Sequence, residues 1–126
     1  MARVLLVDDD VDLVEQNRLV LESRGHEVTA AYSASEARDV LSERAVDVAV
    51  MDVMMESPTA GLDLARWVHQ TYPKMPAIML SGVHEKTGSP FRFEPDPEWL
   101  PIVKFLDKPV APARLAEEIE ALVPGT

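Results

Sequence analysis

Short apolar runs alternate with longer stretches of helical periodicity along most of this chain, and this pattern constrains the fold more than any other feature. The apolar runs occupy residues 4–7, 28–31, 46–51, 77–80 and 102–106. Helical spacing of apolar residues marks 11–24, 35–44, 61–72 and a last stretch from about residue 112. Because parallel strands are joined by crossover helices, this alternation predicts an α/β fold built from βαβ units around a parallel sheet.

Length and composition fit one domain spanning residues 1–126. Of the 126 residues, 47% are hydrophobic and 27% are charged, which is enough apolar material for one core. The net charge of -10 opposes direct binding of nucleic acid. The absence of cysteine excludes thiolate metal sites and cysteine nucleophiles. Because no apolar run is long enough for a signal peptide or a membrane span, we expect a cytoplasmic protein without membrane contact.

The rhythm of strands and helices breaks between residues 83 and 101. Four prolines, Pro90, Pro95, Pro97 and Pro101, lie in this segment, and no helical stripe runs through it. Proline removes a backbone donor and costs about 3 kcal/mol inside a helix. The pattern therefore predicts that a Pro-rich loop shortens or replaces the helix expected at this point.

Polar side chains follow the predicted strands where the strands end. Asp8 and Asp9 follow the first strand, Asp52 the third, Ser81 the fourth and Lys108 the fifth. In an open parallel sheet, ligands bind beyond the carboxyl ends of the strands. We therefore expect these five groups to converge on one edge of the sheet.

Three carboxylates brought close together repel one another unless one is protonated or a cation lies among them. Oxygen ligands alone favour a hard cation such as Mg²⁺, which often binds together with a phosphate group. Phosphoryl transfer depends on positioning and on neutralising the phosphoryl oxygens. The expected roles are Asp52 as nucleophile, Asp8 and Asp9 as metal ligands, Lys108 as a cationic clamp and Ser81 as a hydrogen-bond donor.

Four motifs in this order resemble the receiver domain of response regulators in two-component signalling. They are LLVDDD at 5–10, VMDVMM at 50–55, MLSG at 79–82 and FLDKP at 105–109. The resemblance covers essentially the whole chain. It implies a flavodoxin-like, doubly wound sheet of five parallel strands in the order 2-1-3-4-5.

The resemblance also implies a function and a site. A histidine kinase or phosphotransfer protein would donate a phosphoryl group to Asp52, and the domain would switch a protein-interaction surface. Asp8, Asp9, Asp52 and the backbone carbonyl of Met54 would hold Mg²⁺, and Phe105 would rotate as Ser81 moves toward the phosphoryl group. The downstream target is unspecified, and a homodimer remains open.

Some residues depart from the family pattern or have simpler explanations. Glu56 stands where the family commonly has proline, so the loop after Asp52 is expected to be reshaped. Asp10 is explained equally well as a helix cap, and Phe105 as a core aromatic. We interpret His26, His69 and His84 as surface or structural residues.

Two other functions share the same carboxylates. A small Mg²⁺-dependent phosphatase with an aspartyl nucleophile would use them, but Met54 stands where its general acid is expected. A degenerate receiver acting as a scaffold is disfavoured by the intact acidic pair, Asp52 and Lys108. We therefore expect a signalling phosphoacceptor rather than an enzyme, apart from its self-catalysed transfer and hydrolysis.

Overall fold

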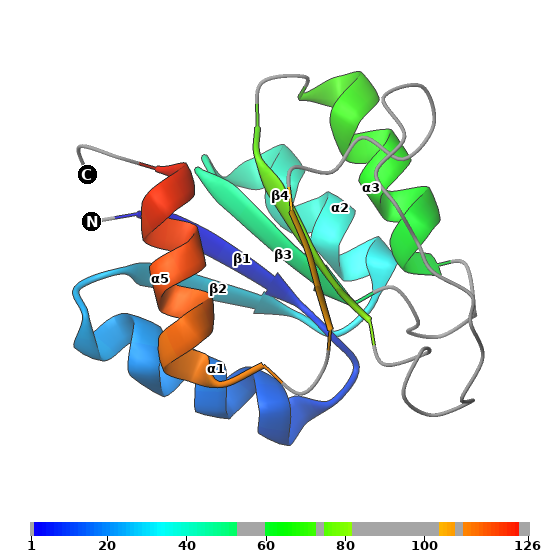
Figure 1. Ribbon diagram of the computed structural model, residues 1–126. Coiled ribbons are helices and arrows are strands. Elements are labelled where there is room, and N and C mark those ends of the chain that lie inside the picture. Colours follow the sequence, from blue (N-terminus) through cyan, green and yellow to red (C-terminus); the bar gives the residue numbers. More distant parts are fainter. Residues whose placement is uncertain (1, 53–59, 73–74, 82–103, 108–109, 124–126) are drawn as a thin grey trace.

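The computed structural model describes residues 2–52, 60–72, 75–81, 104–107 and 110–123 of the chain. Its elements are the strands β1 (Arg3–Val7), β2 (Glu27–Ala31), β3 (Val48–Asp52), β4 (Ala77–Ser81) and β5 (Lys104–Asp107), and the helices α1 (Val11–Ser23), α2 (Ala34–Glu43), α3 (Ala60–Thr71) and α5 (Pro112–Leu122). The strands are parallel and form a sheet in the order β2-β1-β3-β4-β5. Helices α1 and α5 cover one face of the sheet, and α2 and α3 cover the other (Figure 1). The predicted doubly wound α/β fold is confirmed.

Local signals fix where the first two helices begin and where α1 ends. Asp10 caps α1, since its Oδ1 accepts a hydrogen bond from the Leu13 amide at 3.2 Å. Ser33 caps α2 in the same way, accepting from the Glu36 amide at 3.1 Å. Gly25 follows α1 with a φ of 89°, a left-handed conformation that glycine adopts without strain. The chain can therefore turn at once from α1 into β2.

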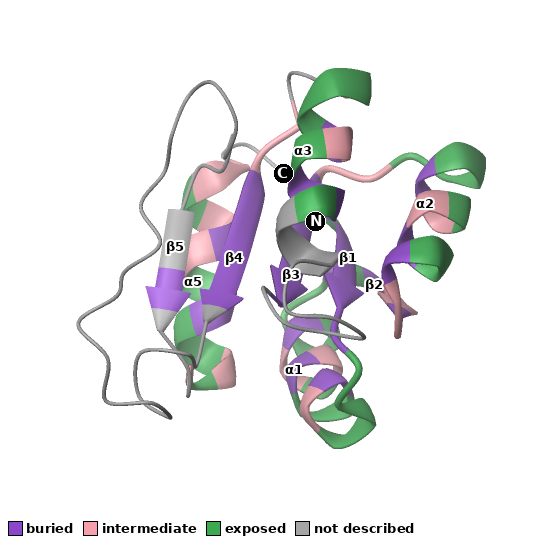
Figure 2. Cartoon of the chain, turned by 90° about the vertical axis from the view of Figure 1, so that its right-hand side faces the viewer, coloured by how far each residue is buried: buried purple, intermediate pink, exposed green. Residues whose placement is uncertain are grey.

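Alternate residues of the strands supply two separate apolar cores. In β1, Leu5 and Val7 pack with α2 and α3, whereas Val4 and Leu6 pack with α1 and α5. Strand β3 is buried along its whole length. Purple segments line the inner side of each helix that faces the sheet, as expected for strands covered on both faces (Figure 2).

The structure corrects the sequence analysis in a few places. Strand β3 begins at Val48, two residues later than predicted, and it includes Asp52. In α1, the apolar spacing predicts one side formed by Leu13, Val14, Val20 and Leu21, but Leu13 and Val20 are only half-buried. Asn17 is buried instead, at 5% exposure. It lies three residues after Val14 and four before Leu21, so it shares their side of the helix.

The described residues leave one expectation untested and test another only in part. The Pro-rich loop predicted for residues 83–101 lies outside the described residues. Among the helices that are described, none is long and apolar enough to cross a membrane.

Candidate functional site

Three aspartates meet at the carboxyl edge of the sheet. Asp8, Asp9 and Asp52 each offer one carboxylate oxygen, and these three atoms lie within 4.8 Å of one another. Asp8 and Asp52 are buried, with 5% and 7% of their surfaces exposed, whereas Asp9 is exposed. The predicted convergence of the three carboxylates is therefore found in the structure.

The register of two neighbouring strands brings these residues together. Strands β1 and β3 are paired in parallel, with Val7 opposite Met51. The next residues along the two strands are Asp8 and Asp52, so two carboxylates separated by more than forty positions become neighbours. Asp8 also stays aligned with the sheet, since its amide donates a hydrogen bond to the Ala31 carbonyl at 3.1 Å.

The three consecutive aspartates have different surroundings. One carboxylate oxygen of Asp8 accepts a hydrogen bond from the Asp10 amide at 3.0 Å, which orients the Asp8 side chain. Asp10 caps α1, as the simpler interpretation of this residue predicted. Asp9, between them, is exposed at the edge of the site. The cluster therefore consists of two buried carboxylates, of which Asp8 is oriented by the Asp10 amide, and one exposed carboxylate.

The remaining predicted residues are placed only in part. Ser81 is the last residue of β4, where it pairs with Asp107 of β5, so its backbone lies at the same edge as Asp52. The backbone of Phe105 lies in β5 opposite Met79. The side chains of Ser81 and Phe105 are outside the described residues, as are Met54 and Lys108.

The donor set suits a hard divalent cation. All three groups are carboxylates, the type of ligand that Mg²⁺ accepts, and they lie close enough to share one ion. Carboxylates at this separation repel one another, and a cation among them removes that cost. The residues present thus fit Mg²⁺, as the sequence predicted.

A second charged cluster, which sequence analysis did not predict, joins the turn after α1 to α5. Arg24 contacts Glu120 through two hydrogen bonds of 2.7 and 2.9 Å, and His26 Nε2 lies 2.8 Å from the same carboxylate. The hydrogen bonds from Arg24 and then from His26 lower the pKa of Glu120 from 4.5 to about 2. His26 Nδ1 accepts from the Ala2 amide at 3.0 Å, so Nε2 carries the proton that faces Glu120 in the neutral ring. His26 is also buried, at 8% exposure, which agrees with its interpretation as a structural residue.

Comparison with known proteins identifies one family. Residues 4–120 match the family described as the response regulator receiver domain. The transcriptional regulatory protein GltR of Pseudomonas aeruginosa is 31% identical over 122 residues, which are 95% of this chain and 48% of that protein. The 3'3'-cGAMP-specific phosphodiesterase 2 of Vibrio cholerae is 41% identical over 73 residues, 53% of this chain and 14% of that protein.

The fold comparison agrees with the sequence comparison. The receiver domain protein (CheY-like) from Methanospirillum hungatei JF-1 superposes with a TM-score of 0.80 at 26% identity, covering 98% of this chain and 94% of that one. By contrast, the chain spans about half of GltR and a smaller share of the phosphodiesterase. These two relatives are named for different activities, and what they share with this chain is the matched region. The chain belongs to the response regulator receiver domain family.

Proposed function

We propose that this chain is a phosphoacceptor in a two-component phosphorelay, with Asp52 as the residue that accepts the phosphoryl group. The observation that carries the proposal is the grouping of Asp8, Asp9 and Asp52 oxygens within 4.8 Å at the carboxyl edge of the sheet. Receiver domains bind Mg²⁺ at such an acidic cluster and interact with histidine kinases or phosphotransfer proteins. A phosphohistidine of such a partner is the proposed donor, and the phosphorylated domain switches a protein-interaction surface.

The reaction is a displacement at phosphorus. A carboxylate oxygen of Asp52 forms a bond to phosphorus, the bond from phosphorus to the donor's imidazole nitrogen breaks, and that nitrogen keeps the electron pair. Asp52 ends a fully buried strand, which restricts the directions from which its carboxylate can be approached. Its place in the strand fixes its backbone before the donor arrives, which lowers the entropic cost of the step.

The acidic neighbours have a separate role. Asp8, Asp9, Asp52 and the backbone carbonyl of Met54 are the proposed Mg²⁺ ligands. When bound, the ion supplies positive charge that offsets the phosphoryl oxygens. The hydrogen bond from the Asp10 amide fixes the orientation of Asp8, as partners of metal ligands commonly do.

Three further residues complete the proposed site. Lys108 neutralises phosphoryl charge, and Ser81 donates a hydrogen bond to a phosphoryl oxygen. Phe105 changes rotamer as Ser81 moves, which links phosphorylation to the surface near β5. The position of the Ser81 backbone, beside the end of β3 in the sheet, supports its part in this arrangement.

We propose that residues 1–126 form one receiver domain that acts in the cytoplasm, where kinases of this kind obtain their phosphoryl groups. The output activity does not follow from the relatives, because the matched region is the part that a transcriptional regulator and a phosphodiesterase have in common.

Incubation with acetyl phosphate and Mg²⁺, followed by intact-mass measurement, tests the proposal. We expect one added phosphoryl group per chain in the wild type and none in Asp52→Asn, because the amide is not a nucleophile for this reaction. Asp10→Asn is the matched control: asparagine caps a helix as well as aspartate does, so labelling should persist.

The same experiment separates the alternatives. Continuous release of inorganic phosphate over many turnovers, without a stable label, would indicate the phosphatase. A chain that is folded by circular dichroism but never labelled, by small donors or by kinases, would indicate the scaffold. Labelling that survives Asp52→Asn would show that the acceptor is another residue.

A further inference from the structure

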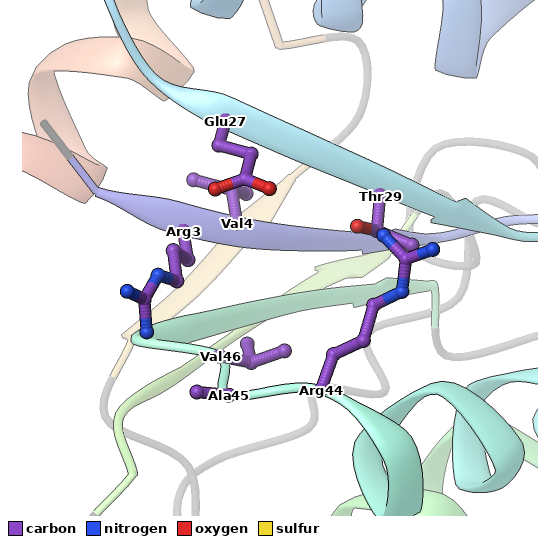
Figure 3. Close-up of a pocket in the computed structure, with 7 residues that line it drawn as sticks. All are labelled: Arg3, Val4, Glu27, Thr29, Arg44, Ala45 and Val46. Carbon is purple, nitrogen blue, oxygen red and sulfur yellow. The ribbon is translucent and has the colours of Figure 1, made fainter.

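A pocket of about 300 Å³ lies at the amino edge of the sheet, at the opposite end of the strands from Asp52. Figure 3 shows the residues that line it: Arg3, Val4, Glu27, Thr29, Arg44, Ala45 and Val46. They come from the first residues of β1 and β2 and from the connection between α2 and β3. A volume near 300 Å³ is at the small end of the range for ligand pockets, so it suits a small molecule.

The strand register explains why polar side chains gather there. Arg3 is paired with Glu27, and Leu5 with Thr29. Because Leu5 belongs to the core beneath α2, the side chains of Arg3, Glu27 and Thr29 fall on the same face as this core. Helix α2 ends at Glu43, and the residues that follow it, 44–46, form the remaining wall of the pocket.

The two arginines of the pocket differ from most other arginines of the chain. Within the described residues, neither the Arg3 nor the Arg44 guanidinium has an ion-pair partner, although the chain carries 22 acidic residues. Other arginines of the described residues have side-chain partners, among them Arg18, paired with Glu15 and Glu22; Arg24, paired with Glu120; Arg114, paired with Glu118; and Arg38, over the Trp67 ring. Two guanidinium groups without partners therefore line one cavity of an acidic protein.

Neighbouring groups within the described residues do not bind the guanidinium groups of these two arginines. The nearby carboxylate of Asp47 accepts a hydrogen bond from the Arg3 backbone amide at 2.8 Å, so it is engaged with the main chain. The Arg44 side chain extends away from the end of α2 toward Thr29 of β2, rather than back over the last carbonyls of the helix (Figure 3). The Arg44 guanidinium thus lies beside Thr29 at one side of the pocket, whereas the Arg3 side chain extends from β1 at the other side, away from Arg44 (Figure 3).

The remaining lining groups narrow the chemistry of the ligand. Guanidinium groups bind phosphate and carboxylate groups through paired hydrogen bonds. Glu27 lies on β2 beside Arg3, and its carboxylate repels an anion but accepts a hydrogen bond from a hydroxyl group (Figure 3). Thr29 adds a hydroxyl, and Val46 adds apolar surface.

We propose that this pocket is a binding site for a small organic oxyanion, a phosphate monoester or a carboxylic acid that also carries hydroxyl groups. Arg44 binds its anionic group, Arg3 adds positive charge at the other side of the pocket, and Glu27 accepts a hydrogen bond from its hydroxyl. The site is separate from the phosphoacceptor edge and does not depend on the function proposed for Asp52.

Titration of the isotope-labelled chain followed by nuclear magnetic resonance tests this proposal. The probes are glycerol phosphate, inorganic phosphate and glycerol, each added without divalent cations to the unphosphorylated protein. We expect glycerol phosphate to produce saturable shifts at residues 3, 27, 29 and 44–46, while signals of Asp8, Asp9 and Asp52 stay in place. Glycerol should produce none of these shifts, because it lacks the anionic group.

Variants assign the roles of the lining residues. Arg44→Gln should weaken binding of glycerol phosphate by about tenfold, the effect of losing one charge-assisted contact, and Arg3→Gln should weaken it less. Arg114→Gln is the matched control, an exposed arginine in α5, and should change the affinity little. Glu27→Gln should reduce the preference for glycerol phosphate over inorganic phosphate, because the repulsion of the anion is removed and the acceptor is weakened.

Two outcomes would overturn the proposal. One is a set of linear, unsaturated shifts spread over exposed arginines, including Arg114, which would indicate general ion binding. The other is saturable binding that neither Arg3→Gln nor Arg44→Gln weakens, with the chemical-shift dispersion of both variants showing that they are folded.

Discussion

The two faces of the sheet are covered by apolar cores of the same kind, but their helices are joined by different contacts. On one face, Glu120 of α5 binds Arg24 and His26 beside the end of α1 through hydrogen bonds of 2.7 to 2.9 Å. On the other, Trp67 of α3 and Tyr72 directly after that helix form an edge-on aromatic pair at 5.9 Å that contacts α2. The comparison separates two kinds of stabilisation, one sensitive to acid and one insensitive to it.

The aromatic contacts reach from α3 to α2. The Arg38 guanidinium lies 5.8 Å from the centroid of the Trp67 ring. The Tyr72 hydroxyl donates to the Leu41 carbonyl at 2.9 Å, which ties the residue after α3 to the last turns of α2. Because neither contact depends on a carboxylate, this pair of helices should respond little to acid.

The largest effects should come from truncating one leucine in each core. Leu64 of α3 and Leu115 of α5 are both fully buried, at 0% exposure. Each Leu→Ala change should lower the free energy of unfolding by about 3 kcal/mol, since apolar contacts are lost and a cavity is left. Urea denaturation of both variants measures this. A loss from one face that is several times that from the other would contradict the equality of the two cores.

A smaller effect is expected from Tyr72→Phe, which removes the hydroxyl and keeps the ring. The Leu41 carbonyl loses its side-chain donor, so the free energy of unfolding should fall by about 1 kcal/mol. The loss should be the same at pH 7 and at pH 4, because the hydrogen bond that is removed involves no carboxylate. A loss that shrinks in acid would show that the aromatic contacts are coupled to the charged cluster.

The smallest effect should be the acid sensitivity of Glu120, because its carboxylate is partly exposed and surface ion pairs are screened by solvent. Its folded-state pKa, about 2, lies below the ordinary value of 4.5. The stabilisation is therefore complete above pH 4.5 and is lost as the pH falls from about 4.5 to about 2. Denaturation in steps of pH should show wild type and Glu120→Gln converging in this window.

A control keeps that result interpretable. Glu22→Gln removes a carboxylate that pairs with Arg18 along the exposed side of α1. Its difference from the wild type should stay small at every pH, since exposed pairs at this spacing contribute little. Equal convergence for both variants would mean that the acid response is a general effect of charge rather than a property of the α1–α5 contact.

Much of the fold and the centre of the site could be predicted, because both follow from local patterns and from the geometry of parallel sheets. Apolar runs marked the strands, and the rule that strand ends share an edge placed Asp8, Asp9 and Asp52 together. The sequence indicated only in part that Asp8 belongs to the carboxylate cluster while Asp10 caps α1. This difference depends on a hydrogen bond between a side chain and an amide two residues away.

Other features had no signal in the sequence. Asn17 is buried in α1, although hydrophobicity patterns assign polar residues to the solvent side. His26 and Glu120 are 94 residues apart, so no periodicity or motif connects them. Arg3 and Arg44 likewise line one pocket only because β1 pairs with β2 and α2 ends nearby. Long-range proximity of this kind is set by the tertiary fold.

The alternation of side chains along β1 and β3 has a consequence for cooperativity. Leu5 and Met51 face one layer of helices, while Leu6 and Val50 face the other. Loss of either helical layer would therefore expose one side of the same two strands, and the remaining layer would be left on a half-solvated sheet. The two layers should accordingly unfold together as a single unit rather than in sequence. A structural change at Asp8 and Asp52, where these two strands end, would in the same way affect both faces of the sheet.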